Sequence, residues 1–554
     1  MTFHPMLPSL LLAATLSASG SFVMAAQPLR IDTHLTVPSE SPTLVQIARS
    51  LPSQLAAPAR HVVPLRLVTP QMKSGRAAPG TTGAAPQSVL QYGTGAVTPS
   101  VYTGSPLNIE GIASDNTVAP PDTNGAVGET QYVQWVNTRL AVYRKNDGAL
   151  LLGPIPGNAV FSGITGSPGA DACRDSNFGD PIVQYDKLAK RWILTQFAWD
   201  PANTATGPYY QCIAVSTSPD ATGSYYRYVW DIRDSAGNPV FPDYPKLAVW
   251  PDAFYFTWVL FENPIDGAYL GPRGCGVDRA AMLAGGAPAA RCYDFGTAFG
   301  PVLASDLDGL MAPPAGSPNY MLALDFGNDG SGDHLFMWRF SFTNASVSDA
   351  ITIPVAPFII ACPSLFGGPC VRQPPPGEPL DALADRLMYR LAYRNFGTRE
   401  ALVVNHSVQQ PGASTDGPVG VRWYEFRNLA TEPGVYQQGT WAPDTNSRWM
   451  GSIAMDRMGN IALGYSVSGT STAPGVRYSG RMRSEPLGRL EPEEVVINGG
   501  GVQVDTHNRW GDYSAMASDP VSDCRFWYTQ EYMAATGSFN WRTRINSFRF
   551  GNCQ

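Results

Sequence analysis

The chain has 554 residues, and its 38 Lys and Arg against 45 Asp and Glu give a formal net charge of -7 at pH 7. This acidic balance, without any run of Lys and Arg, argues against nucleic acid as a partner. The 55 glycines, 49 prolines and 11% aromatic residues are typical of a secreted protein rich in turns and strands.

Residues 1–25 have the pattern of a secretory signal peptide. An apolar run begins at Leu7, and Val23 and Ala25 occupy the minus-three and minus-one positions of a cleavage site after Ala25. A retained membrane anchor is the alternative interpretation. No later stretch is apolar and uncharged over about 18 residues, so we expect no membrane span after signal removal. The mature protein is therefore expected outside the cell or in the periplasm.

Residues 26–104 are rich in Ala, Pro, Ser and Thr and show little periodicity of either kind. This composition predicts a low-complexity segment that is a propeptide or a linker, mostly extended. From about residue 105 the chain changes to short apolar and aromatic runs separated by Gly, Pro, Asn and Asp, with almost no helical periodicity. We expect residues 105–554 to form one all-β domain.

A repeated plan runs through this domain: a polar lead-in, a short apolar strand, a turn at Asp, Asn or Gly, and a second strand. Its copies lie at 120–137, 178–197, 241–259, 385–407, 447–466 and 509–532. The turns recur about every 60 residues, except for one interval about twice as long, where the stretch 319–342 supplies a seventh copy. Seven such units predict a seven-bladed β-propeller, and the regular spacing disfavours the alternative, an array of β-sandwiches.

The eight cysteines are an even number and fit the oxidising compartment that a signal peptide implies. They contain no CxxC pair, which favours structural disulfides over a metal or thiol site. Sequence alone leaves the connectivity open, and the simplest arrangement joins neighbours along the chain. It predicts the pairs Cys173–Cys212, Cys275–Cys292, Cys362–Cys370 and Cys524–Cys553.

The polar lead-in residues of the copies are the candidate functional site. In a propeller the first strands of all blades begin near one end of the central channel, so equivalent positions converge there. The ionisable residues expected at this mouth are Asp122, Asp180, Asp243, Arg386, Arg448, Arg509 and Asp512.

Carboxylates held apart, one protonated and one ionised, suit glycoside hydrolysis. On this ground Asp180, Asp243 and Asp512 are the candidate catalytic acids and bases, with Tyr513 assisting. Arginines bind anionic sugars through bidentate bonds, and tyrosines stack on sugar rings. The candidate substrate-binding residues are Asp122, Tyr244, Arg386, Arg448 and Arg509.

A structural interpretation competes with this catalytic one. Polar residues at the start of repeated strands also cap turns, and Arg and Asp from adjacent blades also neutralise each other. Against it stands the cost of burying many ionisable groups that are neither solvated nor used.

No HxH or HExxH pattern predicts a zinc site, and no GxSxG predicts a serine-hydrolase elbow. The stretches "DTNG" at 122–125 and "DFGNDGSGD" at 325–333 have the oxygen ligands that Ca²⁺ prefers. Each lacks the spaced Glu of an EF-hand loop, so a plain turn is the competing interpretation. Ca²⁺ is the one candidate cofactor, and no metal ligand is assigned.

The stretch "STSPDATGSYYRYVW" at 216–230 resembles a relaxed Asp-box of the sialidase-like propellers, with Ser218, Asp220 and Gly223 in order. The motifs "APPDTNGAVG", "FPDYPKLAVWPDA", "SRWMGSIAMD" and "RWGDYSAM" look like those of a group of secreted bacterial β-propeller proteins. This resemblance, which spans most of 110–553, implies secretion and the propeller fold without a particular activity. No FRIP-type motif precedes the first blade, so it does not imply an exo-sialidase.

Two hypotheses follow. The first is a secreted propeller that acts on extracellular carbohydrate, as a glycoside hydrolase or polysaccharide lyase, through carboxylates at the channel mouth. The second is a non-catalytic propeller that binds a glycan or protein at the cell surface, with calcium as a candidate requirement. Two carboxylates about 5 to 10 Å apart in an open pocket would favour the first. Arg and Asp closed into mutual pairs would favour the second.

Overall fold

The computed structural model describes Met1 and residues 28–36, 38–52, 60–63, 66, 68, 90–91, 101–102, 107–327, 329–410, 412–413, 417–504 and 507–554. The expected signal peptide lies outside the described residues, apart from Met1. Among the helices in these ranges, none has the length and apolar character needed to cross a membrane.

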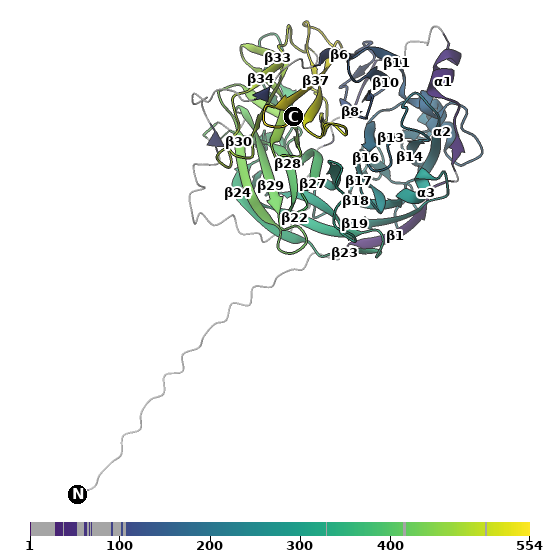
Figure 1. The fold of residues 1–554 in the computed structure, drawn as a ribbon, viewed down its shortest axis with the longest axis horizontal. Helices are drawn as coiled ribbons and strands as arrows, with labels where there is room; N and C mark the ends of the chain where they lie inside the picture. The colour runs from purple at the N-terminus through teal and green to yellow at the C-terminus, as the bar shows by residue number, and fades with distance from the viewer. Residues whose placement is uncertain are drawn as a thin grey trace.

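The chain forms successive antiparallel sheets in which most strands pair with the next strand along the chain (Figure 1). The first sheet contains β8 (Asn124–Val127), β9 (Gln131–Val136), β10 (Arg139–Arg144) and β11 (Leu150–Pro156). The next contains β12 (Ile182–Asp186), β13 (Arg191–Trp199), β14 (Tyr209–Ser216) and β15 (Tyr225–Asp231). It is followed by β16 (Phe241–Val249), β17 (Ala253–Phe261), β18 (Tyr269–Asp278) and β19 (Ala289–Asp294).

The second half of the chain continues this pattern. One group contains β20 (Val302–Asp308), β21 (Asn319–Asp325), β22 (Ser331–Ser341), β23 (Ser346–Val347) and β24 (Ile351–Ile359). The next contains β27 (Met388–Asn395), β28 (Glu400–Gln409), β29 (Val419–Arg427) and β30 (Gly434–Trp441). Then follow β31 (Ser447–Met455), β32 (Ile461–Gly469), β33 (Thr472–Arg481) and β34 (Glu494–Ile497). The last contains β35 (Ala515–Ser518), β36 (Arg525–Tyr532), β37 (Arg542–Phe550) and β6 (Asn108–Ala113).

The first strands of these groups contact one another in a closed ring, in the order β8, β12, β16, β20, β27, β31, β35 and back to β8. The ring closes because β6, which precedes β8 in sequence, pairs with β37 near the C-terminus. Figure 1 shows the sheets arranged around this common centre. Such a ring of small sheets is a β-propeller, which buries both faces of each sheet against its neighbours.

The predicted repeats correspond to hairpins, and most of them are the first hairpin of a sheet. Asp186 and Asp519 make the turns because each accepts backbone hydrogen bonds, from Leu188 at 3.0 Å and from Val521 at 2.9 Å. The copy placed at 319–342 differs, since it covers β21 and β22, the second and third strands of its group. The first strand, β20, is followed by a long loop instead of a tight turn. The hairpin of β20 and β21 therefore lacks the turn residue by which the other copies are recognised in the sequence.

The four predicted disulfides are all present: Cys173–Cys212, Cys275–Cys292, Cys362–Cys370 and Cys524–Cys553. The second joins directly paired residues of β18 and β19. The last ties the C-terminal residues to the start of β36.

The described parts of residues 26–104 add structure around the outside of the sheets. β1 (Leu29–His34) pairs with β19, β2 (Ser39–Glu40) with β15, β4 (Leu90–Gln91) with β30, and β5 (Val101–Tyr102) with β37. The helix α1 (Leu44–Ser50), which Thr43 caps, contacts β11. These strands cover sheet edges that would otherwise expose unpaired backbone groups. A propeptide role for this region stays a prediction.

Short elements fill the connections between sheets. They are β7 (Val118–Ala119), β25 (Pro369–Val371), β26 (Leu380–Asp381), α2 (Ala170–Asp175), α3 (Arg279–Leu283) and the 3-10 turns Gly157–Phe161, Pro201–Asn203 and Pro363–Leu365. The segment that resembles an Asp-box forms the turn between β14 and β15, where Asp220 Oδ1 accepts a hydrogen bond from Thr222 N at 2.9 Å.

Candidate functional site

The channel mouth lies where the first strands begin. Asp122 precedes β8, Asp180 precedes β12, Arg386 precedes β27 and Asp512 precedes β35, whereas Asp243 lies inside β16. Residues from five different sheets thus contribute ionisable side chains at the same end of the channel. The expected convergence of these residues is present in the structure, because a common hydrogen-bonded and ion-paired cluster joins most of them.

One chain of hydrogen bonds crosses the mouth between sheets. Asp122 Oδ1 accepts from the backbone N–H of Asp512 at 2.8 Å, and Asp122 Oδ2 accepts from Asn137 Nδ2 at 2.9 Å. Asn137 Oδ1 accepts in turn from the backbone N–H of Asp180 at 3.0 Å. Asp122 is completely buried, so it acts as the junction of three lead-in segments.

Two arginines at the mouth are held by carboxylates. Arg509 donates from Nη1 to Asp381 Oδ2 and from Nη2 to Asp512 Oδ1, each at 2.5 Å. Arg386 forms a bidentate pair with Asp385, with distances of 2.7 and 3.0 Å. Both arginines are only 2% exposed. Sequence reasoning missed Asp381, which lies outside the repeated plan, and Asp385, which is the first residue of the copy at 385–407.

An aromatic cage holds a buried lysine that sequence reasoning also missed. The Nζ of Lys246 lies 3.4 Å from the ring centroid of Tyr244 and 3.9 Å from that of Tyr513, in cation–π contact with both. Arg386 stacks on Tyr244 with its Cζ 4.4 Å from the ring centroid. The available signal was a second charged residue, after Asp243, in the largely apolar strand "FPDYPKLAV".

Burial raises the pKa values of the carboxyl groups at the mouth. The pKa of Asp122 rises to about 8, through burial and then the nearby charge of Asp512. Burial and the neighbouring Asp122 raise the pKa of Asp180 well above its usual range. Burial also raises the pKa of Asp243, although Arg386 opposes the shift. The mouth therefore holds carboxyl groups that can carry a proton near neutral pH.

Burial acts in the opposite direction on the lysine. It lowers the pKa of Lys246 to about 7, although Asp180 opposes the shift. Burial raises the pKa of Asp381 to about 7 against the effect of Arg509, and it raises the pKa of Glu531 well above its usual range. Acids with raised pKa values beside an amine with a lowered one are the combination that proton-transfer sites use.

The backbone at the mouth is strained. Asp122, Asp180 and Tyr244 have φ values of 47°, 48° and 52°, in the left-handed region that non-glycine residues rarely adopt. Each costs on the order of 1 kcal/mol or more and persists because the surrounding contacts hold it. The pairing of β16 with β17 also shifts register between Asp243 and Lys246, so the strand is irregular at Tyr244 as well.

Arg448 does not join this cluster. Its guanidinium pairs with Asp444 and with Glu493, the latter at 2.8 Å, beside its own sheet. Like Asp122, the residues Asp180 and Asp243 form no ion pair within the described part of the chain. The two mouth arginines pair instead with Asp381, Asp385 and Asp512.

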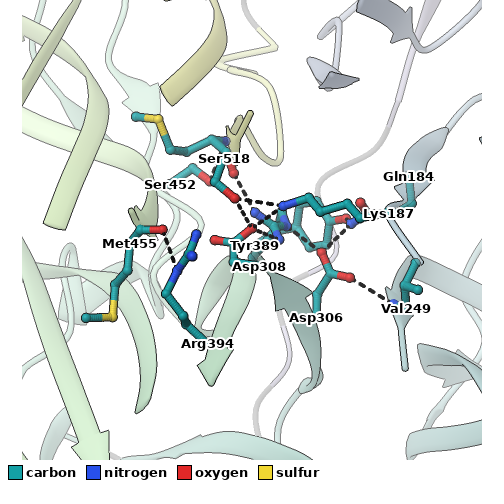
Figure 2. A network of polar contacts seen from close by, with 12 residues as sticks. Gln184, Lys187, Val249, Asp306, Asp308, Tyr389, Arg394, Ser452, Met455 and Ser518 are labelled. Atoms are coloured by element: carbon teal, nitrogen blue, oxygen red, sulfur yellow. Dashed lines mark hydrogen bonds and ion pairs between the residues drawn. The ribbon is translucent and has the colours of Figure 1, made fainter. Parts of the chain in front are cut away.

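A second polar network fills the channel toward the ends of the first strands (Figure 2). Arg390 bridges Asp306 at 2.6 Å and Asp308 at 2.9 Å, and Gln184 Nε2 donates to Asp306 at 2.8 Å. Lys187 also pairs with Asp308. All of these carboxylates are buried, so this end of the channel is closed by its own side chains.

Part of the N-terminal region lies against the mouth. We call residues 60–63, 66 and 68 the covering segment. Within it, β3 (His61–Val62) pairs in parallel with β7, and the carbonyl of Val63 accepts a hydrogen bond from Arg509 Nε at 2.8 Å. The mouth carboxylates and arginines are buried partly for this reason.

The described residues contain no group of three or more His, Cys, Asp or Glu placed to hold a metal ion. In the stretch 325–333, of which residue 328 is not described, Asp329 Oδ1 accepts from Ser331 N at 3.0 Å, as in a plain turn. A cleft of about 750 Å³ lies beside the ends of β8 and β35, away from the mouth, and its lining includes Lys145, Asp519 and Arg525.

No protein-family model and no curated protein sequence matches the chain. Among solved structures, an α-L-arabinofuranosidase of Fusarium graminearum has 7% identity over 82% of this chain and 99% of its own, with a TM-score of 0.35. An ulvan lyase has 9% identity over 75% of this chain and 96% of its own, with a TM-score of 0.35. An apocarotenoid oxygenase of Synechocystis has 9% identity over 74% and 65%, with a TM-score of 0.29. Likenesses this low decide neither fold nor activity.

Proposed function

We propose that the chain is a secreted, seven-bladed, sialidase-like propeller that acts on an extracellular carbohydrate at its channel mouth, as a glycoside hydrolase or polysaccharide lyase. The ring of seven first strands supports the blade number. Four disulfides support an oxidising compartment outside the cytoplasm.

One observation carries the proposal: Asp180 and Asp243 have raised pKa values and form no ion pair within the described part of the chain, and the charge of Asp180 acts on Lys246. A carboxyl group that has a raised pKa and no ion-pair partner is costly to the fold and useful for proton transfer. The left-handed backbone of Asp180 adds a further cost at the same place.

Each residue would have one role in the reaction. Asp180 or Asp243, in the protonated form, donates a proton to the leaving oxygen of the sugar. Asp512, which Arg509 holds, serves as base or as electrostatic partner. In a lyase, Lys246 in its neutral form would remove the sugar proton instead. Tyr244 and Tyr513 would face the sugar ring, and Arg386 would bind an acidic group.

The closed ion pairs favour the second candidate, a non-catalytic propeller that binds a glycan or protein at the cell surface. Arg509 and Arg386 are each saturated by carboxylates of the same chain, as in a structural cluster. Under this candidate the mouth stabilises the ring, and ligands bind elsewhere.

The test compares Asp180→Asn and Asp243→Asn with the control Asp175→Asn, whose side chain is 61% exposed on the outside of the protein. Each purified protein is incubated with a panel of neutral and acidic polysaccharides, with Ca²⁺ and with a chelator, and release of reducing or unsaturated ends is measured. We expect a loss of about a hundredfold or more in either mouth variant, the usual effect of losing a general acid or base.

Unchanged turnover of a cleaved polysaccharide in both mouth variants would overturn the catalytic assignment. Retained glycan binding without any cleavage by the wild-type protein would establish the second candidate instead. Activity that requires Ca²⁺ would support the expectation that calcium is a cofactor of the protein.

A further inference from the structure

The covering segment contacts the mouth through backbone groups. The carbonyl of Val63 accepts from Arg509 Nε at 2.8 Å, and the carbonyl of Arg66 accepts from Arg386 Nη2 at 2.9 Å. The N–H of Val68 donates to Asp385 Oδ2 at 2.6 Å. The segment therefore occupies hydrogen-bonding groups of the two arginines that the mouth offers to an acidic ligand.

Side-chain and backbone contacts of the described residues also hold the segment, among them Arg60, whose Cζ lies 5.5 Å from the ring centroid of Phe539. The guanidinium of Arg66 stacks on Phe261, with its Cζ 4.5 Å from the ring centroid, and more distantly on Phe241. Val68 is buried, and Val63 N donates to the carbonyl of Ala119 at 2.9 Å. Two paired residues in β3 complete the attachment. The strand pairing of the described residues is short compared with the ladders of the sheets, and segments with little strand pairing open at a lower free energy than the core.

We infer that the covering segment is an intramolecular blocking group: it occupies the mouth in place of an external ligand and must be displaced before that ligand binds. This inference rests on the proposed function, because it concerns control of the same site. Only molecules in which the segment is open bind a ligand at the mouth, so the apparent dissociation constant equals the intrinsic constant divided by the open fraction. Cleavage or displacement of the N-terminal region would raise that fraction toward one.

Two substitutions weaken the segment without changing a mouth residue. Val68→Pro removes the N–H that Asp385 accepts, and Arg66→Ala removes the stacking on Phe261. Arg49→Ala, at an exposed position in α1 of the same N-terminal region, is the matched control. A hydrogen bond to a charged group contributes enough that its loss raises the open fraction by about tenfold or more.

The measurement is the rate at which phenylglyoxal modifies individual arginines, read by mass spectrometry of peptides. Arg386 and Arg509 report the mouth, and Arg390, buried and paired with Asp306 and Asp308, reports general loss of structure. We expect modification of Arg386 and Arg509 to accelerate about tenfold in Val68→Pro and Arg66→Ala. We expect Arg390, and all three arginines in Arg49→Ala, to keep the wild-type rate.

Unchanged rates at Arg386 and Arg509 in both variants would overturn the inference. If the modification of Arg390 accelerates equally, the variant has lost its fold. Hydrogen exchange of the wild-type protein then tests whether the covering segment opens. The Val63 and Val68 amides should then exchange at least tenfold faster than those of β12, whereas exchange only through global unfolding would overturn the inference. No polysaccharide is used, so this result is independent of whether the mouth is catalytic.

Discussion

Replacing Arg509 with Met tests how the mouth cluster contributes to stability. Met has a similar length and no charge, so the substitution removes the guanidinium while filling much of its volume. Asp381 and Asp512 then lose the partner they share, and their side chains are 0% and 12% exposed. Water cannot replace the lost hydrogen bonds at Asp381, because that side chain is wholly buried.

Removing one partner of a buried ion pair costs about 3 to 5 kcal/mol, because the remaining charge is left without compensation. The cost depends on pH through Asp381. Its folded pKa is already raised from 3.8 to about 7, and the loss of Arg509, which opposes that shift, raises it further. The folded protein binds more protons than the unfolded chain between these values, so stability falls as pH rises through that window.

We therefore expect Arg509→Met to lower the free energy of unfolding by about 3 to 5 kcal/mol at pH 8 and by clearly less at pH 5, where Asp381 becomes neutral. The assay is urea unfolding followed by tryptophan fluorescence, with the disulfides intact. Arg233→Met is the control, because Arg233 pairs with Asp231 on the surface with its side chain 43% exposed. Its expected loss is about 0 to 1 kcal/mol at both pH values.

A loss below about 1 kcal/mol at pH 8 would refute the reasoning, because it would mean that the mouth carboxylates do not depend on Arg509. An equal loss at pH 5 and pH 8 would refute the pH argument, since protonation of Asp381 would then have no part in the effect.

Two further predictions concern the tail and the caged lysine. The double substitution Cys524→Ser and Cys553→Ser opens a loop of 29 residues and should lower the free energy of unfolding by about 3 to 4 kcal/mol in the same urea assay. A loss below about 1 kcal/mol would contradict the loop-closure argument. Lys246→Met should change how the free energy of unfolding depends on pH. The pKa of Lys246 in the folded protein is about 7, below the ordinary 10.5, so the folded wild type binds fewer protons than its unfolded chain between these values. The wild type should therefore gain stability over the variant as pH rises from 7 to 10.5. A difference between the two proteins that stays constant over that range would contradict the lowered pKa.

Much of the architecture follows from local sequence. Turn aspartates such as Asp186 and Asp519 form hydrogen bonds within a few residues, so their hairpins are visible in the sequence. The spacing of the hairpins predicts a ring, because a single small sheet cannot bury both faces. The disulfide pairs are likewise short-range, and neighbours along the chain are neighbours in space.

The site was predicted only where a residue repeats its position from blade to blade. Asp122, Asp180 and Asp512 share the lead-in position, and the ring brings them together. Arg448 shares it as well, yet its side chain turns to Glu493, because long flexible side chains select partners by tertiary geometry. Lys246 has no equivalent in the other copies and could not be found from the pattern.

The sequence by itself determined the all-β class, the hairpins and the end of the channel where charge gathers, since these depend on local turns and on a repeated period. Tertiary structure alone decided which carboxylates the arginines neutralise, which are left with raised pKa values, and that residues 60–63 lie across the mouth. Those outcomes depend on burial and on contacts between residues hundreds of positions apart, such as Val63 and Arg509, which no local pattern encodes.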